Sequence, residues 1–565
     1  MRKNLILNVL FCCVMGVAAT RPSIAGPKAG KGADPRDARL EALAEQVRRL
    51  SAELQELRSE GSAKGERLEK VEKATERLDA VEKTVERNSE KLAKPSTFKV
   101  SGDFRTQWNS MSGDAQAYMQ YSPTGTYQPG GPGTPMFRSM PVNGYRTEND
   151  SLLTNRLGLN MRTDATENIS VKARFLMYKL WGHETMDPVA GSFFADRAFG
   201  VFDGTVGHVP SDNALRVDQA YATINNIGDE PVWLSVGRRP STHGVPTNLR
   251  QNVDKTDDNG GIPAILVDYA FDGLTLGWAP ELSNWPGFYT KLCYGRGFDS
   301  GFESPMNTLK DTDFLGLNVS PYKTERLQTE LQFQRGTNIF NVPSDGVSFF
   351  GNALPVTRNM GDLDWFGGSV VYKFGANEHG GLTAFASYAQ SKTKPNDQLF
   401  SLPFFSMDNG ATWMNGGYGL LYNDDPATPQ VDVQSHTGRA YYIGLRDDLP
   451  NGKTAIGLEY NHGSEYWVGM VPAADDLWTS KLGTRGNVWE VYLIQSLAAK
   501  KVSPFGDAFL RVGYQHYDFE YTGSNGWIGA PQRVGDLTAA NPAGTQLLTP
   551  LSSAENLYLS LDVKF

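Results

Sequence analysis

The C-terminal end of this chain alternates strictly between apolar and other side chains. Apolar residues occupy every second position, at Leu557, Leu559, Leu561, Val563 and Phe565. Because successive side chains of a β-strand point to opposite faces, this period of two predicts a strand with one apolar face and one wet face. About ten residues is also the length that a tilted strand needs to cross a lipid bilayer as part of a barrel.

The first 25 residues predict a secretory signal peptide that is removed from the mature protein. Its marks are a basic start, an apolar stretch and a small-x-small cleavage site, found at Arg2 and Lys3, at residues 5–19 and at Ser23-Ile24-Ala25. A membrane anchor is the alternative, but the apolar stretch is shorter than the roughly 20 residues of a helical span. Residues 26–37 are predicted to be a linker.

Cysteine usage and motifs predict a chain without a cofactor or a resident metal. Cys12 and Cys13 lie in the predicted signal peptide, so the mature chain keeps only Cys293 and forms no intramolecular disulfide. The sequence contains no C-x-x-C-H for haem attachment, no C-x-x-C pair for zinc and no H-E-x-x-H. The seven histidines are scattered and no G-x-S-x-G accompanies them, so we expect no enzymatic activity.

Composition excludes two broad classes of protein. Mean hydropathy is -0.40, and after the signal no segment approaches the 18 apolar residues of a transmembrane helix, so a helical membrane protein is excluded. A transmembrane barrel needs only alternate residues to be apolar, which fits this value. The net charge of -9 disfavours binding to nucleic acid.

Residues 38–94 differ from the rest and predict an α-helical coiled coil. Apolar residues recur with heptad spacing in two seams, Leu40, Leu43, Val47, Leu50, Leu54 and Leu57, then Val71, Ala74, Leu78, Val81, Val85 and Leu92. Gly61 and Gly65 separate the seams, which differ in phase. A narrow apolar stripe on a charged helix needs partner helices, so we expect a periplasmic stalk that joins copies of the chain, as a trimer or a dimer. A loose, partly helical tether is the alternative.

From residue 97 to residue 565 the period of the sequence is two, which predicts an all-β transmembrane barrel. Short connections such as 163–168, 226–230, 321–325, 375–380 and 447–452 take turns with long ones near 110–151, 182–213, 240–261, 341–362, 394–436, 464–483 and 523–553. Such alternation is typical of the periplasmic turns and extracellular loops of one barrel. The count is about 16 antiparallel strands. Leu274–Pro280 also resembles a strand, but counting it alone breaks the alternation of short and long connections, so it is interpreted as an irregular segment; if it pairs with a further strand, the count becomes 18.

The positions predicted to face the barrel lumen are rich in basic side chains on the N-terminal strands. They are Arg105, Arg156, Arg162, Lys172, Arg174, Arg216 and Arg239. A cationic wall would attract anions to a pore. The alternative is that acids such as Asp103 and Asp218 balance these charges.

The third long loop, residues 240–261, is a candidate for a constriction inside the barrel. It carries Asp254, Asp257 and Asp258, which would then face the basic wall. An ordinary surface loop is the alternative. Calcium binding is disfavoured because the loop lacks the D-x-D-x-D-G spacing and the terminal Glu of a calcium loop.

Several segments resemble known outer-membrane proteins. The C-terminal strand that ends in Phe565 resembles the closing strand of Gram-negative outer-membrane barrels, and FKVSGDFRTQW, RVDQAYATI, VWLSVGRRP and YTKLCYGRGF resemble porin strands. The barrel part of the chain looks closest to a functionally uncharacterised porin-like family with an N-terminal periplasmic coiled coil. The resemblance implies a barrel in the outer membrane, surrounded by lipid, with its stalk in the periplasm.

Three functions follow from this architecture. The first is a passive diffusion channel for small hydrophilic solutes, anionic ones among them, formed by a homotrimer. The second is a structural sleeve around a periplasmic multihaem cytochrome. The third is a tether between the outer membrane and the cell wall.

Overall fold

A computed structural model describes two units, Met1–Ser96 and Thr97–Phe565. The described residues are 44–53, 98–127, 134–182, 210, 212–240, 244–253, 270–341, 357–377, 380–401, 405–406, 412–413, 417–425, 427–428, 430–471, 476–497, 506–546 and 548–565. In the first unit, residues 44–53 form an exposed α-helix that carries Val47 and Leu50 of the predicted seam. The rest of the predicted stalk, the linker and the signal peptide lie outside the described residues.

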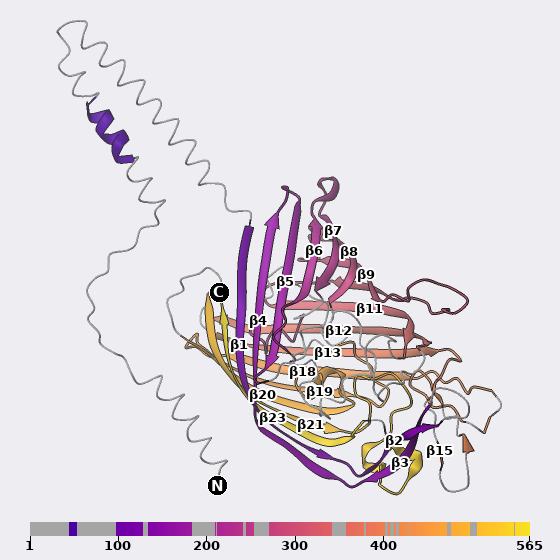
Figure 1. The fold of residues 1–565 in the computed structure, drawn as a ribbon. Coiled ribbons are helices and arrows are strands. Elements are labelled where there is room, and N and C mark those ends of the chain that lie inside the picture. The colour runs from indigo at the N-terminus through magenta and orange to yellow at the C-terminus, as the bar shows by residue number, and fades with distance from the viewer. Residues whose placement is uncertain are drawn as a thin grey trace, which may run out of the picture. The chain divides into compact units, whose positions relative to one another are not determined.

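The second unit is a closed barrel of sixteen antiparallel strands (Figure 1). This confirms the predicted count of about 16 strands and excludes the alternative count of 18. The strands are β1 (Phe98–Ala115), β4 (Tyr145–Asp164), β5 (Ile169–Leu180), β6 (Arg216–Ile224), β7 (Val232–Pro240), β8 (Ala270–Trp278), β9 (Tyr289–Phe298), β10 (Thr312–Ser320), β11 (Leu327–Phe340), β12 (Asn359–Asn377), β13 (Gly380–Pro395), β18 (Thr437–Asp448), β19 (Thr454–Gly463), β20 (Gly486–Ser496), β21 (Asp507–Phe519) and β23 (Leu551–Lys564). Each pairs with its neighbours in the chain, and β1 pairs with β23 to close the ring.

One sequence-based interpretation was wrong. Leu274–Pro280 was expected to be irregular, but most of it lies in β8, which pairs with β7 and β9 over its length. The alternation of connections survives because residues 279–288 form the short link to β9, and residues 299–311 form a longer loop between β9 and β10. Strand β8 is therefore an ordinary member of the barrel.

The long connections carry additional structure of their own. The described small elements in them are β2 (Tyr118–Tyr127), β3 (Thr134–Val142), β14 (Phe400–Ser401), β15 (Phe405–Ser406), β16 (Thr412–Trp413), β17 (Gly417–Tyr418), β22 (Thr545–Gln546) and the 3₁₀ turns η3 (Lys481–Gly483), η4 (Val534–Asp536) and η5 (Pro542–Gly544). A further 3₁₀ turn, η2 (Ile227–Asp229), lies in a short link. Strands β2, β3 and β22 form a small sheet that joins the first and last long loops.

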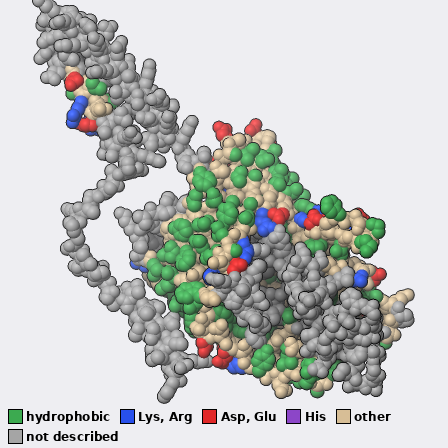
Figure 2. Space-filling model, viewed as in Figure 1, with side chains coloured by type: hydrophobic (Ala, Val, Ile, Leu, Met, Phe, Trp, Pro, Cys, Tyr) green, Lys and Arg blue, Asp and Glu red, His purple; other side chains and the backbone are tan. Residues whose placement is uncertain are grey.

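The barrel strands expose apolar side chains on one face and bury the other. On β10, Leu315 is 51% exposed while its neighbour Phe314 is 3% exposed. Figure 2 shows hydrophobic side chains gathered over the visible face of the strands. Such an outward apolar band is what a transmembrane barrel presents to lipid. No helix within the described ranges is long and apolar enough to cross a bilayer.

The terminal strand closes the barrel with its last residue. The backbone amides of Gly102 and Phe565 each donate to the other's carbonyl, at 2.7 and 2.9 Å. A Cβ on Gly102 would lie 2.6 Å from the Phe565 ring, so only glycine leaves room for it. The alternating C-terminal strand, β23, therefore pairs with β1 and closes the barrel.

We expect a charge on the outward face to destabilise the barrel according to its depth. Val491 lies at the middle of β20 and is 46% exposed. Val491→Arg should lower the free energy of unfolding by about 2–4 kcal/mol, because arginine there must enter hydrocarbon. Guanidinium titrations of the protein refolded in lipid vesicles measure this.

Gln495 serves as the control for depth, since it lies on the same face near the end of β20. Gln495→Arg should cost about 1 kcal/mol or less. Equal effects of the two substitutions would contradict a lipid-facing band.

Candidate functional site: the inner wall of the barrel

The inward-facing cations of the first strands are paired with acids. Arg105 lies 2.6 Å from Asp562 on β23, and both side chains are at most 10% exposed. Arg174 on β5 reaches Asp103 at 2.7 Å and Asp218 at 3.3 Å. Asp103 and Asp218, the acids expected to balance the basic side chains under the alternative interpretation, therefore both contact Arg174.

A glycine makes the reach of Arg174 possible. A Cβ on Gly158 of β4 would lie 2.3 Å from the Arg174 guanidinium. The guanidinium therefore lies flat across β4 on its way to Asp103. Arg156 comes within 3.8 Å of the same carboxylate, so two arginines share Asp103.

The remaining predicted cations lie toward the strand ends. Arg162 pairs with Asp164 at 3.4 Å with about 40% of its side chain exposed, and it stands opposite Lys172 in the β4–β5 register. Arg216 is 2.8 Å from Asp212 at the start of β6. Hydrogen bonds from Arg216 and from the backbone of Ala214 lower the pKa of Asp212 to about 2.

Arg239 on β7 differs from the others. Its guanidinium lies 5.5 Å from the centre of the Tyr221 ring and 5.3 Å from that of Trp233. Its Nε is buried without a hydrogen-bond partner. Within the described ranges, no carboxylate oxygen comes within ion-pair distance of it.

The described part of the third long loop, residues 244–253, lies against the opposite wall. Arg446 of β18 donates to the Leu249 carbonyl at 2.6 Å and to Asn252 at 2.9 Å, and Lys564 of β23 donates to the Asn252 carbonyl at 2.8 Å. The loop thus crosses the lumen from β7 to β18 and β23. Asp254, Asp257 and Asp258 lie outside the described residues, and their place at a constriction stays a prediction.

A buried charge network holds this loop, and the sequence analysis missed it. Arg250 pairs with Asp476 at 2.7 Å and with Glu490 of β20 at 2.9 Å. Lys481, in the loop between β19 and β20, contacts Glu490 and Glu459, and all three side chains are 1% exposed. We call these five residues the charge network. The acidic inward positions of β19 and β20 were the only sequence signal, since Arg250, Asp476 and Lys481 lie in loops without periodicity.

A small polar hollow of about 20 Å³ lies beside the charge network. Its lining includes Arg105, Gln107, Arg250, Asp476, Arg511 and Tyr558. It lies between the third loop and strands β1, β21 and β23. Guanidinium, carboxylate and amide groups therefore face one another there across a space large enough for water.

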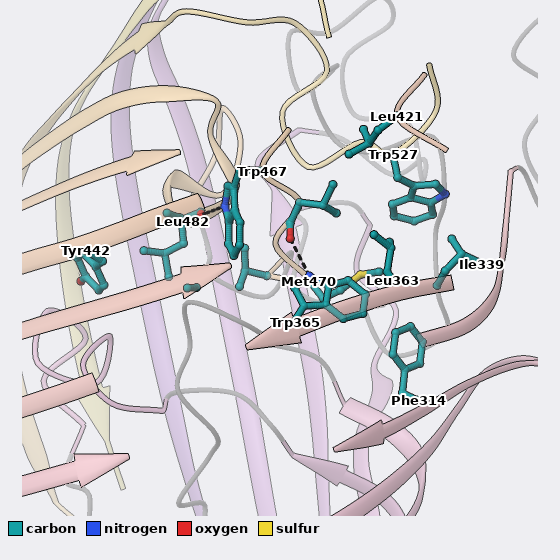
Figure 3. Packing of buried hydrophobic residues seen from close by; sticks show 14 of the residues in the cluster. Phe314, Ile339, Leu363, Trp365, Leu421, Tyr442, Trp467, Met470, Leu482 and Trp527 are labelled. Carbon is teal, nitrogen blue, oxygen red and sulfur yellow. Dashed lines mark hydrogen bonds between the residues drawn. The ribbon is translucent and has the colours of Figure 1, made fainter. Parts of the chain in front are cut away.

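The other side of the lumen is filled by an apolar cluster (Figure 3). Trp467, Val468 and Met470 from the loop after β19 pack with Trp365 and with Trp527 of the last long loop. Each indole N–H in this group donates to a backbone carbonyl at 2.8 Å, on Val468, Leu482 and Phe340. Tryptophans in otherwise polar loops were the sequence signal for this packing.

The inner wall also presents polar atoms that no described protein group satisfies. Within the described ranges, the side-chain nitrogen and oxygen of Asn318 form no hydrogen bond, and neither do the hydroxyls of Ser369 and Ser387. Buried polar groups without protein partners are normally satisfied by water. As for metals, the described side chains include no group of three or more His, Cys, Asp or Glu that could hold an ion.

A protein-family model described as "Protein of unknown function (DUF3373)" matches residues 146–565. The chain belongs to this family. The match covers fifteen of the sixteen barrel strands, all except β1. No curated protein matches the chain.

Several solved structures are similar to the chain over most of its length. OprB of Pseudomonas putida has 10% identity and a TM-score of 0.39, over 85% of this chain and 96% of that one. The anion-selective porin from Comamonas acidovorans has 11% identity and a TM-score of 0.37, over 83% and 99%. OmpT of Vibrio cholerae has 11% identity and a TM-score of 0.35, over 83% and 97%. Sequence identities and TM-scores this low do not identify a solute for this chain.

Proposed function

We propose that the chain is an outer-membrane porin, a passive diffusion channel for small hydrophilic solutes. The observation that carries the proposal is the contrast between the two faces of the closed barrel. The outer face exposes apolar side chains such as Leu315, while the inner wall carries polar atoms, as on Asn318, that need water. A wet lumen inside a lipid-facing cylinder is what a passive channel requires.

The inward-folded loops favour a channel over a sleeve. Residues 244–253 cross the lumen and the apolar cluster fills part of it. A folded cytochrome would need that space. The predicted tether through the stalk does not compete with a channel, because the two roles use different parts of the chain.

We further propose that the seven predicted cations line the water path and that Asp254, Asp257 and Asp258 extend the third loop into it. The ion pairs of Arg105, Arg174 and Arg216 argue for a weak preference for anions rather than a strong one, because paired charges present a smaller net field. A homotrimer joined by residues 38–94 remains part of the proposal, since the heptad seam needs partner helices.

Planar-bilayer recording on the purified full-length protein tests the channel. We expect stepwise conductance increases, with a reversal potential in a salt gradient that shows a modest preference for anions. Heat-denatured protein at the same detergent concentration is the control. Barrels that insert without any conductance would overturn the proposal.

A further inference from the structure

Four cations lie on the outward face of the barrel, near the strand ends that join the long loops. They are Arg335 of β11, Lys392 and Lys394 of β13 and Arg439 of β18. Each alternates along its strand with buried residues, so it shares the face of the exposed apolar side chains. Asp364 of β12 stands opposite Arg335 on one side and opposite Lys392 on the other. On the far side of β13, Lys392 stands opposite Thr437, two positions from Arg439. We call the four cations the cationic margin.

Two carboxylates on β12 lie among these cations. Asp364 is shared by two of them, since it lies 2.6 Å from Arg335 and 2.5 Å from Lys394. Asp362 stands opposite Lys394 in the strand register, and one of its oxygens accepts a hydrogen bond from the backbone amide of Asn338 at 2.9 Å. Two carboxylates therefore face four cations, and both already accept hydrogen bonds.

The other two cations of the margin are exposed. Within the described ranges, neither Lys392 nor Arg439 forms an ion pair, and both side chains are open to the surroundings of the barrel. The same row of outward positions is balanced on β7 to β10, where the ion pairs are Arg238 with Asp272 at 3.0 Å and Arg296 with Asp313 at 2.6 Å. The surplus of positive charge is thus confined to the sector from β11 to β18.

Exposed aromatic rings lie beside the cationic margin, nearer the middle of the same strands. Two or four residues separate each ring from its cation, in the pairs Phe333 and Arg335, Tyr388 and Lys392, and Tyr441 and Arg439. In transmembrane barrels, aromatic girdles mark the boundary between the hydrocarbon and the headgroups. The cations lie on the loop side of these rings, which places them at the level of the lipid headgroups.

We propose that the cationic margin binds the phosphate groups of an anionic lipid in the leaflet on the long-loop side. The Arg439 guanidinium and the ammonium groups of Lys392 and Lys394 would donate charge-assisted hydrogen bonds to the phosphate oxygens. The acyl chains of the same lipid would lie along the apolar band below. Charge complementarity and continuity with this lipid-facing band favour a lipid as the occupant. The inference concerns the outer surface of the barrel and does not depend on conductance through the lumen.

Native mass spectrometry of the full-length protein released from detergent micelles tests the site. The probes are phosphatidic acid, phosphatidylcholine with the same acyl chains, and inorganic phosphate. Phosphatidic acid should bind roughly tenfold more tightly than phosphatidylcholine, whose headgroup carries a compensating cation. Inorganic phosphate should bind more weakly than phosphatidic acid, because it has no acyl chains to contact the apolar band.

Two triple variants locate the binding. Replacing Lys392, Lys394 and Arg439 together with glutamine should remove the preference for phosphatidic acid, because it removes the surplus charge of the margin. The matched control replaces three exposed cations at the short-turn ends of the strands with glutamine, and these are Arg326, Lys373 and Lys453. It changes the net charge by the same amount and should keep the preference.

Each possible result decides for or against the site. Equal binding of the two lipids to the wild-type protein overturns it, and this comparison needs no variant to fold. Equal loss of the preference in both triple variants also overturns it, because the lipid would then respond only to net charge. Inorganic phosphate that binds as tightly as phosphatidic acid would indicate a site for a free anion. A change of oligomeric mass in the margin variant, with equal binding of both lipids to the wild type, would make the margin an interface between copies of the chain.

Discussion

Replacing Lys481 with methionine is expected to lower the free energy of unfolding of the barrel by about 3–5 kcal/mol, because it breaks a buried ion pair from one side. The Lys481 ammonium lies between Glu459 and Glu490, and the three side chains are 1% exposed. Methionine fills a similar volume but removes the cation that Glu459 contacts, while Glu490 keeps Arg250, so an uncompensated carboxylate is left beside Glu490 in a site that excludes bulk water. Guanidinium titrations of the vesicle-embedded protein, followed by tryptophan fluorescence, would measure the change.

Two further variants identify why Lys481→Met lowers the free energy of unfolding. Adding Glu459→Gln to Lys481→Met removes the uncompensated carboxylate, so it should restore a substantial part of the lost stability. Lys373→Met, at an exposed position near the end of β12, should change stability by about 0.5 kcal/mol or less. A Lys481→Met protein as stable as the wild type would mean that the charge network contributes nothing to holding the loop after β19.

The strands of the barrel could be predicted because lipid imposes a period of two on every one of them. The exception is β8, whose residues Leu274 and Leu276 alternate with Thr275 as a strand requires. It was interpreted as irregular because counting it alone breaks the alternation of short and long connections. That alternation holds only when residues 299–311 are counted as a long loop, and a connection of this intermediate length does not show from the sequence at which end of the barrel it lies.

The sequence predicted which residues face the lumen, but it did not predict which of them form ion pairs with one another. Alternation alone placed Arg105 and Arg174 on the inward face. Their acid partners depend on register and closure: Arg105 meets Asp562 only because β1 and β23 join, although the two residues lie 457 positions apart in the chain. Net charge at the wall is a property of these pairings, so a row of arginines in the sequence overstated the cationic field.

The interior loops were the least predictable part, because a loop has no period that tells whether it folds inward or outward. The third loop enters the barrel through single contacts, such as those of Arg446 with Leu249 and Asn252. The apolar cluster forms from loops that look polar on average but contain single tryptophans, such as Trp467 and Trp527. In such loops, isolated large aromatic residues are better indicators of inward folding than composition.

Arg250→Gln should release the third loop from the wall. Arg250 provides the loop's two contacts with Asp476 and Glu490, and breaking a buried pair of this kind costs about 3–5 kcal/mol. A loss of about 3 kcal/mol would raise the population of the detached loop by about two orders of magnitude. Arg250 takes no part in the pairing of the barrel strands, so the barrel itself should still fold.

Single-channel recording would show this release as higher open-channel current noise, because a loop that leaves the wall alternately blocks and clears the lumen. Arg146→Gln is the matched control. Arg146 pairs with Asp114 and Glu148 at the start of β4, its side chain is 45% exposed, and surface pairs contribute about 0–1 kcal/mol. Open-channel noise identical in Arg250→Gln and Arg146→Gln would show that the third loop is held by its backbone contacts and that the charge network does not restrain it.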